Sequence, residues 1–553
     1  MNYKKYQKMY HPIPLEDRQW PNNEITHAPI WCSVDLRDGN QALYSPMTTE
    51  EKIEFFKFLV KLGFKEIEVG FPAASHTEFE FVRRLIDENL IPDDVTIQVL
   101  TQAREHIIKK TVEALKGAKN AIIHLYNSTS TLQREVVFRK SKEEIKQLAV
   151  DGAKLVMSLV DGQLDGNIRF EYSPESFTCT EPDYAAEVTN AVLDVFKPSE
   201  TNKVIVNLPS TIEVATANVY ADQIEYMCKH LNNREHLVIS VHAHNDRGTG
   251  VASSELALLA GADRVEGTIF GNGERTGNTD VITVALNMFC QGIDPELHLE
   301  NIDEIIEVYE KYNRLPINPR HPYAGEMAYV AFSGSHQDAI KKSMDKFGSS
   351  PSNKWANPYL TIDPTDIGRK YEPILINSQS GKGGVNYIME NKYGYTPPKP
   401  MLAEFSSLIT DMSDEKKTVL TNHEIHQAFK DTYVNVAEPI KTRFYRSTEE
   451  DDCTILSATI EKDGKVTSIE GKGNGPLDAL CNGLRQFLGQ QFEICNYTEH
   501  ALTRSSNSRA ATYIEINDHN HHKTYWGAGV DANINTASIY ALISAVNRML
   551  ADN

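Results

Sequence analysis

Residues 30–70 read IWCSVDLRDGNQALYSPMTTEEKIEFFKFLVKLGFKEIEVG and contain one complete strand–helix–strand unit. The stretches at its two ends, IWCSVDL (30–36) and EIEVG (66–70), are short and contain β-branched and other apolar residues, which is typical of strands. Between them, Ile53, Phe56 and Leu59 recur at the spacing of one helix face, so this helix is predicted to pack on a sheet. The unit therefore predicts a parallel sheet covered by helices.

The same pattern recurs as far as about residue 292. Further strands are predicted at VTIQVL (95–100), AIIHLY (121–126), IRFEY (168–172), KVIVNL (203–208), LVISVHAH (237–244) and RVEGTIF (264–270). Eight strand–helix units in a little over 260 residues match a (β/α)8 TIM barrel, an α/β fold whose active site lies in the loops after the strands. A doubly wound open sheet is the alternative, but it usually has fewer strands and carries a GxGxxG turn after the first, which is missing here.

The rest of the chain changes pattern twice. After the barrel we expect helices and irregular connections, and after them two strand–strand–helix passes that form an α+β module, a type of domain that often senses an effector. The predicted division is an N-terminal arm (1–27), a catalytic TIM barrel (28–320), helical linker subdomains (321–427) and a C-terminal regulatory domain (428–553).

Composition excludes several classes of function. A net charge of −20 argues against a general nucleic-acid binder, whose surface would be basic. No apolar run approaches the roughly 20 residues that cross a bilayer. The N-terminus lacks the apolar core of a secretory signal, so a cytoplasmic location is expected. The seven cysteines form no CxxC pair and are expected to be free thiols rather than disulfides or zinc ligands.

The strongest local signal for chemistry is VHAHND (241–246). Alternate residues of a strand point to the same side, so His242 and His244 share one face. At the end of the seventh strand that face is the mouth of the barrel, where two neutral imidazoles are natural metal ligands. A pair of hydrogen-bonded histidines on a half-buried strand is the alternative interpretation of this motif alone.

A second motif, VDLRDGNQA (34–42), follows the first strand. Asp38 can add a carboxylate to the two imidazoles, and Arg37 can neutralise an oxyanion or bind a carboxylate. A surface ion pair in a loop is the alternative. Further polar groups fall at the ends of other strands, and together they predict a metal-centred site: His124, Glu175, Asn207, Thr211 and GNGERTGN (271–278).

Two glycine-rich stretches, GNGERTGN and SQSGKGG (378–384), do not fit the phosphate loop GxxxxGK[ST], which argues against nucleotide hydrolysis. Tight turns and direct contact with coenzyme A both remain open for them.

The motifs DLRDGNQ (35–41), HAHND (242–246) and GNGERTGN, in this order, resemble the family that contains 2-isopropylmalate synthase, homocitrate synthase, citramalate synthase and related acyl-CoA lyases. The resemblance covers essentially the whole chain and is strongest to the long form of 2-isopropylmalate synthase.

The resemblance implies roles for individual residues. Asp38, His242, His244 and Asn278 would bind a divalent metal. His336 and Tyr359 would complete the catalytic centre with Arg37 and Glu175, reaching the barrel of a partner subunit. The 2-oxo acid would be surrounded by Arg37, Leu100, His124, Ser173, Asn207, Pro209 and Thr211.

The resemblance also implies a reaction: acetyl-CoA condenses with 3-methyl-2-oxobutanoate to give 2-isopropylmalate, the first committed step of leucine biosynthesis. The metal would be Mg²⁺, with Mn²⁺ or Zn²⁺ as alternatives and K⁺ as an activator. A homodimer and feedback inhibition by leucine are implied as well. Where the family has a glycine-rich turn, this chain has TRSSNSRAATY (503–513), with Arg504 and Arg509, so leucine sensitivity is implied less strongly than catalysis.

Two rival functions are considered. A citramalate or homocitrate type of synthase would use another 2-oxo acid, but a dicarboxylic substrate needs an extra cation, and nothing near Leu100 supplies one. A catalytically silent amino-acid-binding regulator is the second rival. The intact set of Arg37, Asp38, His242 and His244 argues against it, because a silent protein has no physical reason to keep a costly ligand cluster.

Overall fold

The computed structural model describes residues 2–5, 7–347, 354–369, 381–416, 420, 422–450, 453–502 and 508–552. The chain forms two compact units. The barrel unit comprises Met1–Ala328 and Pro364–Lys370, and the C-terminal unit comprises Tyr329–Asp363 and Tyr371–Asn553. Within the described residues, no helix combines the length and the apolar character needed to cross a membrane.

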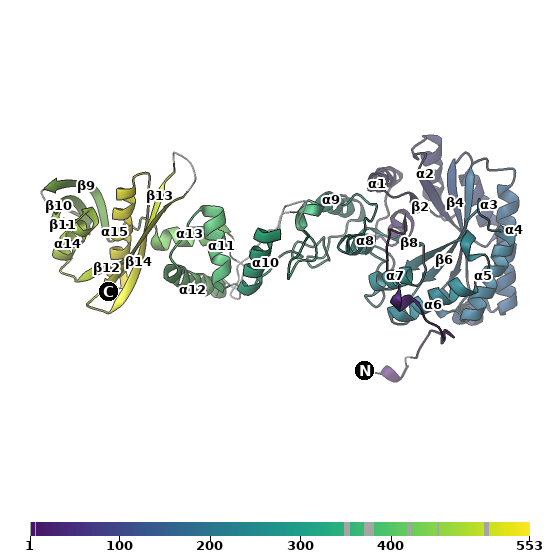
Figure 1. Ribbon diagram of the computed structural model, residues 1–553. Helices are drawn as coiled ribbons and strands as arrows, with labels where there is room; N and C mark the ends of the chain where they lie inside the picture. Colours follow the sequence, from purple (N-terminus) through teal and green to yellow (C-terminus); the bar gives the residue numbers. More distant parts are fainter. Residues whose placement is uncertain are drawn as a thin grey trace. The chain divides into compact units, whose positions relative to one another are not determined.

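Eight parallel strands close into a barrel in the first unit, which confirms the predicted TIM barrel (Figure 1). Strand β8 pairs with β1, so that Ile30 lies opposite Arg264 and the sheet has no free edge. The strands are β1 (Ile30–Ser33), β2 (Glu66–Gly70), β3 (Thr96–Gln102), β4 (Asn120–Ser128), β5 (Asn167–Glu175), β6 (Val204–Ser210), β7 (Leu237–Ala243) and β8 (Arg264–Gly267).

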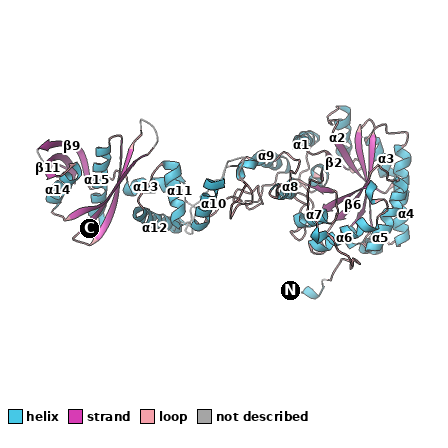
Figure 2. Cartoon of the chain, in the orientation of Figure 1, coloured by secondary structure: helices cyan, strands magenta, loops and turns pink. Residues whose placement is uncertain are grey.

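Helices follow the strands and surround the barrel (Figure 2). The predicted first helix is α1, which buries Ile53, Phe56 and Leu59 and begins at a capping box formed by Thr48 and Glu51. The helices of this unit are α1 (Thr49–Lys61), α2 (His76–Asp87), α3 (Glu105–Ala114), α4 (Lys142–Val160), α5 (Pro182–Phe196), α6 (Ala217–His230), α7 (Gly250–Leu259), α8 (Val281–Phe289) and α9 (Ile302–Asn313).

The end of β1 differs from the prediction. The expected strand ran to residue 36, but β1 ends at Ser33 and is followed by a single π-helical turn, Asp35–Gly39. The carbonyl of Val34 accepts hydrogen bonds from the amides of Asp38 at 2.9 Å and Gly39 at 3.1 Å. Wide turns of this kind are frequent at functional sites, and this one places two predicted site residues at the mouth of the barrel.

The N-terminal arm is fixed to the outside of the barrel unit at its later residues. The guanidinium of Arg18 and the indole N–H of Trp20 both donate to the carboxylate of Asp222 on α6. These contacts lie away from the predicted site.

The C-terminal unit begins with four helices and continues with two antiparallel sheets. The helices are α10 (Gly334–Phe347), α11 (Gly381–Tyr393), α12 (Lys399–Lys416) and α13 (Asn422–Tyr433). The first sheet is β9 (Ile440–Glu450), β10 (Cys453–Lys462) and β11 (Lys465–Gly473), followed by α14 (Pro476–Leu488). The second is β12 (Phe492–Ala501), β13 (Ala510–Asp518) and β14 (Lys523–Asp531), followed by α15 (Ile534–Asp552).

The α+β prediction for this module is confirmed, but its two passes each contain three strands rather than two. The strands missed by the sequence analysis are β9 and β12. Both lie at a sheet edge and expose most of their side chains, so neither carries the apolar run that signals a strand.

The internal duplication of this module is visible at two glycines. A Cβ atom added to Gly471 of β11 would lie 2.0 Å from the carbonyl oxygen of Ala479 on α14. A Cβ atom added to Gly529 of β14 would lie 1.9 Å from the carbonyl oxygen of Ala537 on α15. In both halves the helix crosses its strand at a position where only glycine fits, and the contact is made eight residues further along the chain.

Strands β13 and β14 are buried on both faces. On one face Ile514 packs with α14 and α15, and on the other Tyr513 and Trp526 pack with Phe405 and Phe429 of the preceding helices. Because side chains alternate along a strand, β13 and β14 contribute to two cores, one on each face of the sheet. The core that contains Tyr513 and Trp526 joins the module to α11–α13.

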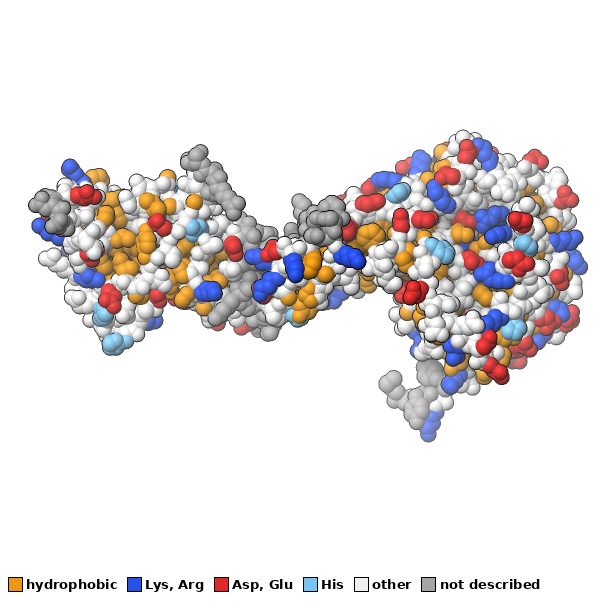
Figure 3. Space-filling model, viewed as in Figure 1, with side chains coloured by type: hydrophobic (Ala, Val, Ile, Leu, Met, Phe, Trp, Pro, Cys, Tyr) orange, Lys and Arg blue, Asp and Glu red, His pale blue; other side chains and the backbone are white. Residues whose placement is uncertain are grey.

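The surface of the molecule agrees with the composition. On the face of the barrel unit seen in Figure 3, acidic and basic side chains are interspersed, and no broad basic area is seen there. The net charge of −20 is therefore not concentrated in a single patch on that face.

Candidate active site

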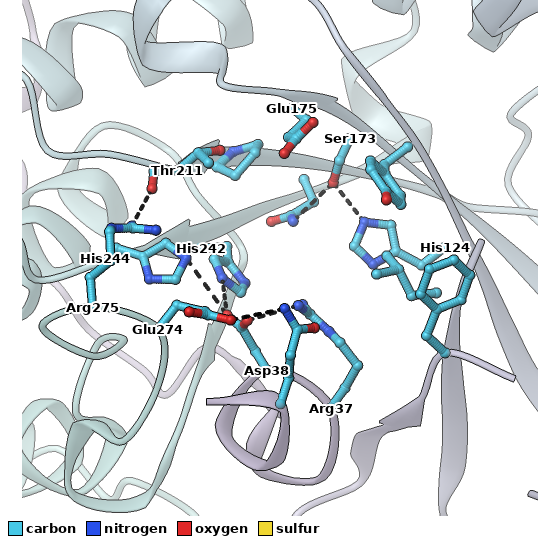
Figure 4. A pocket seen from close by; sticks show the side chains of 16 residues that line it. Arg37, Asp38, His124, Ser173, Glu175, Thr211, His242, His244, Glu274 and Arg275 are labelled. Carbon is cyan, nitrogen blue, oxygen red and sulfur yellow. Dashed lines mark hydrogen bonds and ion pairs between the residues drawn. The ribbon is translucent and has the colours of Figure 1, made fainter. Parts of the chain in front are cut away.

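The C-terminal ends of the barrel strands surround a cavity of about 540 Å³ (Figure 4). This is the end of a TIM barrel at which active sites lie. The predicted residues that line the cavity are Arg37, Asp38, Leu100, His124, Ser173, Glu175, Asn207, Pro209, Thr211, His242 and His244. Residues far apart in the sequence are thus brought to one place.

Asp38, His242 and His244 face one another at one side of the cavity (Figure 4). The Oδ2 atom of Asp38 lies 3.2 Å from Nε2 of His242 and 3.6 Å from Nε2 of His244. Ligands on adjacent corners of an octahedral Mg²⁺ ion, at about 2.1 Å from it, lie about 3.0 Å apart. One oxygen and two imidazole nitrogens therefore have the spacing of a ligand set.

Asn278 adds an amide to this group. Its Nδ2 donates to Oδ2 of Asp38 at 2.8 Å, and its backbone pairs with that of His244. The buried Oδ1 of Asn278 has no hydrogen-bond partner in the described part of the chain. A buried amide oxygen without a donor, next to a carboxylate and two imidazoles, fits a divalent cation.

The charges at this group are strongly perturbed. Burial opposes ionisation of Asp38, but Arg37 and the two histidines outweigh it and hold the pKa of Asp38 well below its usual range. For His242, burial is outweighed by the carboxylates of Asp38 and Glu266, which raise its pKa to about 9. Burial and the charge on His242 lower the pKa of His244 to about 4. Such shifts cluster at functional sites.

Arg37 is fixed between two carboxylates. Its Nη1 lies 3.0 Å from Oδ1 of Asp38, and its Nε donates to Oε2 of Glu68 at 2.5 Å. Because Glu68 is fully buried, the guanidinium has a preset position beside the metal-binding group. A preset cation of this kind can stabilise developing negative charge.

The opposite side of the cavity is polar, and most of its side chains bond to one another, although the buried Oδ1 of Asn207 has no hydrogen-bond partner in the described residues. Ser173 Oγ lies 2.7 Å from Nε2 of His124 and accepts from Nδ2 of Asn207 at 3.0 Å. Ser128 donates to Glu175, and the backbone N–H of Ser176 donates to the hydroxyl of Thr211. The side chains on this side are therefore held in place before any substrate arrives.

His336 and Tyr359 belong to the C-terminal unit. Their rings stack with centroids 4.1 Å apart, and Tyr359 is 49% exposed. They are thus close together, as residues that act as a pair must be. Their catalytic role stays a prediction.

The sequence analysis missed part of the site. Phe71 and Tyr126 line the cavity and were not named as site residues. Three more lining residues, Gln41, Glu274 and Arg275, lie inside the motifs DLRDGNQ and GNGERTGN but were not singled out. Beneath its floor lies a buried polar layer formed by Glu66, Glu68, Gln98, Glu171, Arg264 and Glu266. Charged residues at alternate positions within apolar strands, such as Glu66 and Glu68, are a signal that would have revealed this layer.

The glycine-rich stretches have different outcomes. GNGERTGN forms a turn, in which the carbonyl of Gly271 accepts from the amide of Asn278 and so brings that residue beside Asp38. In SQSGKGG, residues 378–380 lie outside the described residues, and Gly381 begins α11. Arg504, in the departure from the family pattern, also lies outside the described residues.

Each of the three parts of the chain matches a model of a known protein family. Residues 28–308 match an HMGL-like family model, residues 326–390 match the alpha-isopropylmalate synthase post-catalytic domain-like model, and residues 419–550 match the LeuA allosteric (dimerisation) domain. The 2-isopropylmalate synthase of Acetoanaerobium sticklandii is 52% identical over 554 residues, covering 100% of this chain and 97% of that protein. The 2-isopropylmalate synthase of Clostridium acetobutylicum is 54% identical over 557 residues, covering 99% of each. The chain belongs to the 2-isopropylmalate synthase family.

Proposed function

We propose that the chain condenses acetyl-CoA with 3-methyl-2-oxobutanoate to give 2-isopropylmalate and free coenzyme A, in leucine biosynthesis. The observation that carries the proposal is the convergence of Asp38, His242 and His244 beside Arg37 in the cavity of the barrel. This arrangement suits a substrate with adjacent ketone and carboxylate oxygens, which can chelate a metal.

The metal would be held by Asp38, His242, His244 and the amide oxygen of Asn278. When bound, it would act as a Lewis acid that polarises the ketone of the 2-oxo acid. Mg²⁺ is our first choice, and the two imidazoles make Mn²⁺ or Zn²⁺ alternatives. We further propose K⁺ as an activator, on the family resemblance alone.

The remaining chemistry is assigned to side chains. A base removes a proton from the methyl group of acetyl-CoA, the resulting carbanion adds to the ketone carbon, and the new alkoxide takes up a proton. Water then attacks the thioester, the C–S bond breaks, and the sulfur leaves as thiolate and is protonated. We assign the acid–base role to His336 with Tyr359, oriented by Glu175, and charge stabilisation to Arg37.

The direct test is a screen of 2-oxo acids, with turnover measured as release of free thiol from acetyl-CoA. The highest kcat/KM is expected for 3-methyl-2-oxobutanoate. The guanidinium groups that line the cavity, Arg37 and Arg275, are already paired with Asp38, Glu68 and Asp246, which leaves a second substrate carboxylate without a partner among them. A preference for 2-oxoglutarate or pyruvate would overturn the substrate assignment but not the reaction class.

Leu100 is expected to contact the branched end of the substrate. Replacing it by alanine removes apolar contact that a shorter oxo acid does not use. The Leu100→Ala variant should lower kcat/KM for 3-methyl-2-oxobutanoate relative to pyruvate by about 10-fold or more, since a few methyl or methylene groups are worth about 1–3 kcal/mol each. Unchanged discrimination between the two oxo acids would show that Leu100 does not contact the isopropyl group.

We propose leucine as feedback inhibitor, bound in a cavity of about 490 Å³ in the C-terminal unit. The cavity lies at the N-terminus of α14, whose free N–H groups attract a carboxylate. Asp478 and Glu493 can accept an ammonium group, and Ile494 and Ile539 offer an apolar wall. The cavity thus offers one partner for each part of an aliphatic amino acid: its carboxylate, its ammonium group and its apolar side chain.

Shortening this apolar wall should weaken leucine binding. The Ile494→Ala variant is expected to raise the Kd of leucine, measured by calorimetry, by about 10-fold, because it removes three side-chain carbons from the wall of the cavity. Val466→Ala is the matched control, since Val466 is 56% exposed and does not line the cavity. Equal leucine affinity in both variants would exclude this cavity as the leucine site.

We propose a homodimer as the working form. The match to a dimerisation domain supports it, and hydrophobic side chains gather on the face of the C-terminal unit seen in Figure 3. Phe444 and Ile534 of this unit are 65% and 45% exposed. Apolar surface left exposed on one copy is typical of an interface between copies.

A further inference from the structure

Two buried carboxylates lie beneath the floor of the cavity, and each holds residues of the site. Glu68 accepts from Nε of Arg37 at 2.5 Å, and its Oε1 lies 2.9 Å from Nδ1 of His124. Glu266 has its Oε2 atom 2.8 Å from Nδ1 of His242. Glu266 also accepts from Nδ2 of Asn207 at 3.2 Å. Glu68 therefore supports Arg37 and His124, and Glu266 supports a proposed metal ligand and one residue of the oxo-acid side.

Gln98 joins these two carboxylates. Its Nε2 donates to Oε1 of Glu68 at 3.1 Å and to Oε1 of Glu266 at 3.0 Å. Its own Oε1 accepts from Nη2 of Arg264 at 2.7 Å. Gln98 is fully buried, and its amide nitrogen, besides donating to the two carboxylates, lies 3.3 Å from Nδ1 of His124.

The two carboxylates carry like charges. Burial opposes ionisation of Glu68, but Arg37 and His124 outweigh it, and the pKa of Glu68 falls below its usual value. Glu266 accepts from Nη1 of Arg264 at 2.8 Å, and a cationic donor at this distance favours the ionised carboxylate. A neutral amide that donates to both anions keeps them together where repulsion would separate them.

We propose that Gln98 is a positioning residue that holds the metal-binding and oxo-acid-binding halves of the site as one unit. Gln98 does not line the cavity. It acts through Glu68 on Arg37, directly and through Glu68 on His124, and through Glu266 on His242 and Asn207. The inference rests on the proposed function for the identity of the two halves. Partners behind metal-binding histidines commonly set both ring orientation and metal affinity.

The test is Gln98→Met, which keeps the size of the side chain but cannot donate. Calorimetry with Mn²⁺ on metal-stripped protein, without substrates, should show binding about 10- to 100-fold weaker than in the parent protein. The KM for 3-methyl-2-oxobutanoate should rise about 5-fold or more, while the KM for acetyl-CoA stays within about 2-fold. A general loosening of the barrel would shift all three values.

Thr101→Val is the matched control on the same strand. Thr101 is also fully buried, but its hydroxyl bonds to Thr111 on α3, away from the cavity. The Thr101→Val variant should bind Mn²⁺ and the oxo acid with the same affinities as the parent protein. The proposal is overturned if Gln98→Met binds both ligands normally, or if Thr101→Val weakens them to the same degree.

A second variant covers the case in which Gln98→Met does not fold. Glu266→Gln keeps the volume of the side chain and removes the anion that holds His242, and it should also weaken Mn²⁺ binding about 10-fold or more. Normal Mn²⁺ binding by this variant would overturn the proposal. Failure of the proposed function would be seen separately, as a parent protein that binds Mn²⁺ but releases no thiol.

Discussion

Replacing Asp38 by alanine is expected to reduce the rate of thiol release from acetyl-CoA and 3-methyl-2-oxobutanoate by about 10³-fold or more. This loss corresponds to an increase of about 4 kcal/mol in the activation free energy. The carboxylate is the anion that both histidines and Arg37 face. Without it, two imidazoles and an arginine surround the ion position, and a divalent cation loses its only negatively charged ligand. His242→Ala keeps this anion but removes one of the two imidazole ligands, and it is also expected to lower thiol release. Steady-state thiol release at saturating Mg²⁺ measures both variants.

Asp222→Ala is the control for this experiment. Asp222 is a buried carboxylate of the same unit that also pairs with an arginine, but it binds the N-terminal arm rather than the cavity. Its turnover should stay within about 2-fold of the parent value, as expected for a site that makes no contact with the reacting groups. Asp38→Ala with full activity, in protein that melts at the parent temperature, would refute the assignment of this residue.

Removing the divalent metal should lower the rate of thiol release at least as much as Asp38→Ala does. Protein stripped with a chelator and freed of it is expected to show no thiol release above background, and Mg²⁺ or Mn²⁺ should restore turnover. The reason is that Arg37, already paired with Asp38 and Glu68, cannot alone polarise the ketone. Metal binding should also raise the melting temperature, because a ligand that binds only the folded state stabilises it.

The control is the same chelator in the presence of excess Mg²⁺, which should leave turnover unchanged and so exclude damage by the chelator itself. Normal turnover by stripped protein would refute a metal-dependent mechanism. A rise in melting temperature without restored turnover would separate the metal site, which would stand, from the proposed reaction, which would not.

The sequence predicts the barrel well because its strands are buried on both faces. Such strands carry runs rich in β-branched residues, as in VIVNL of β6, and helices with an apolar face, such as α1, follow them. The strands β9 and β12 lie at sheet edges, where polar side chains face water, and so resemble loops in sequence. The prediction for the end of β1 is wrong because VDL alternates apolar and polar residues as a strand does, although Val34 already begins a turn.

The cavity residues could be named because the fold fixes where strands end. Asp38, Glu175 and His242 were predicted from that rule or from family motifs, and the structure gathers them around one cavity. Gln98 and Glu266 were not predicted as site residues because they lie inside strands. There a side chain is expected to pack in the core rather than to take part in the site. Only the closed barrel shows that such side chains meet across its axis. The roles of His336 and Tyr359 stay predictions, since it is the family resemblance that places them at the barrel of a partner subunit.

Because Asp38 lies on the π-helical turn after β1, the site does not tolerate a change in the number of residues in this turn. Consecutive side chains on a helical turn differ in direction by about 100°. Deleting one residue between Val34 and Gly39 would bring a neighbour to the position of Asp38, either the guanidinium of Arg37 or a glycine without a side chain. An insertion or deletion here would thus turn an anionic coordination sphere into a cationic or an empty one, and alignments of active relatives should show no gap in this segment.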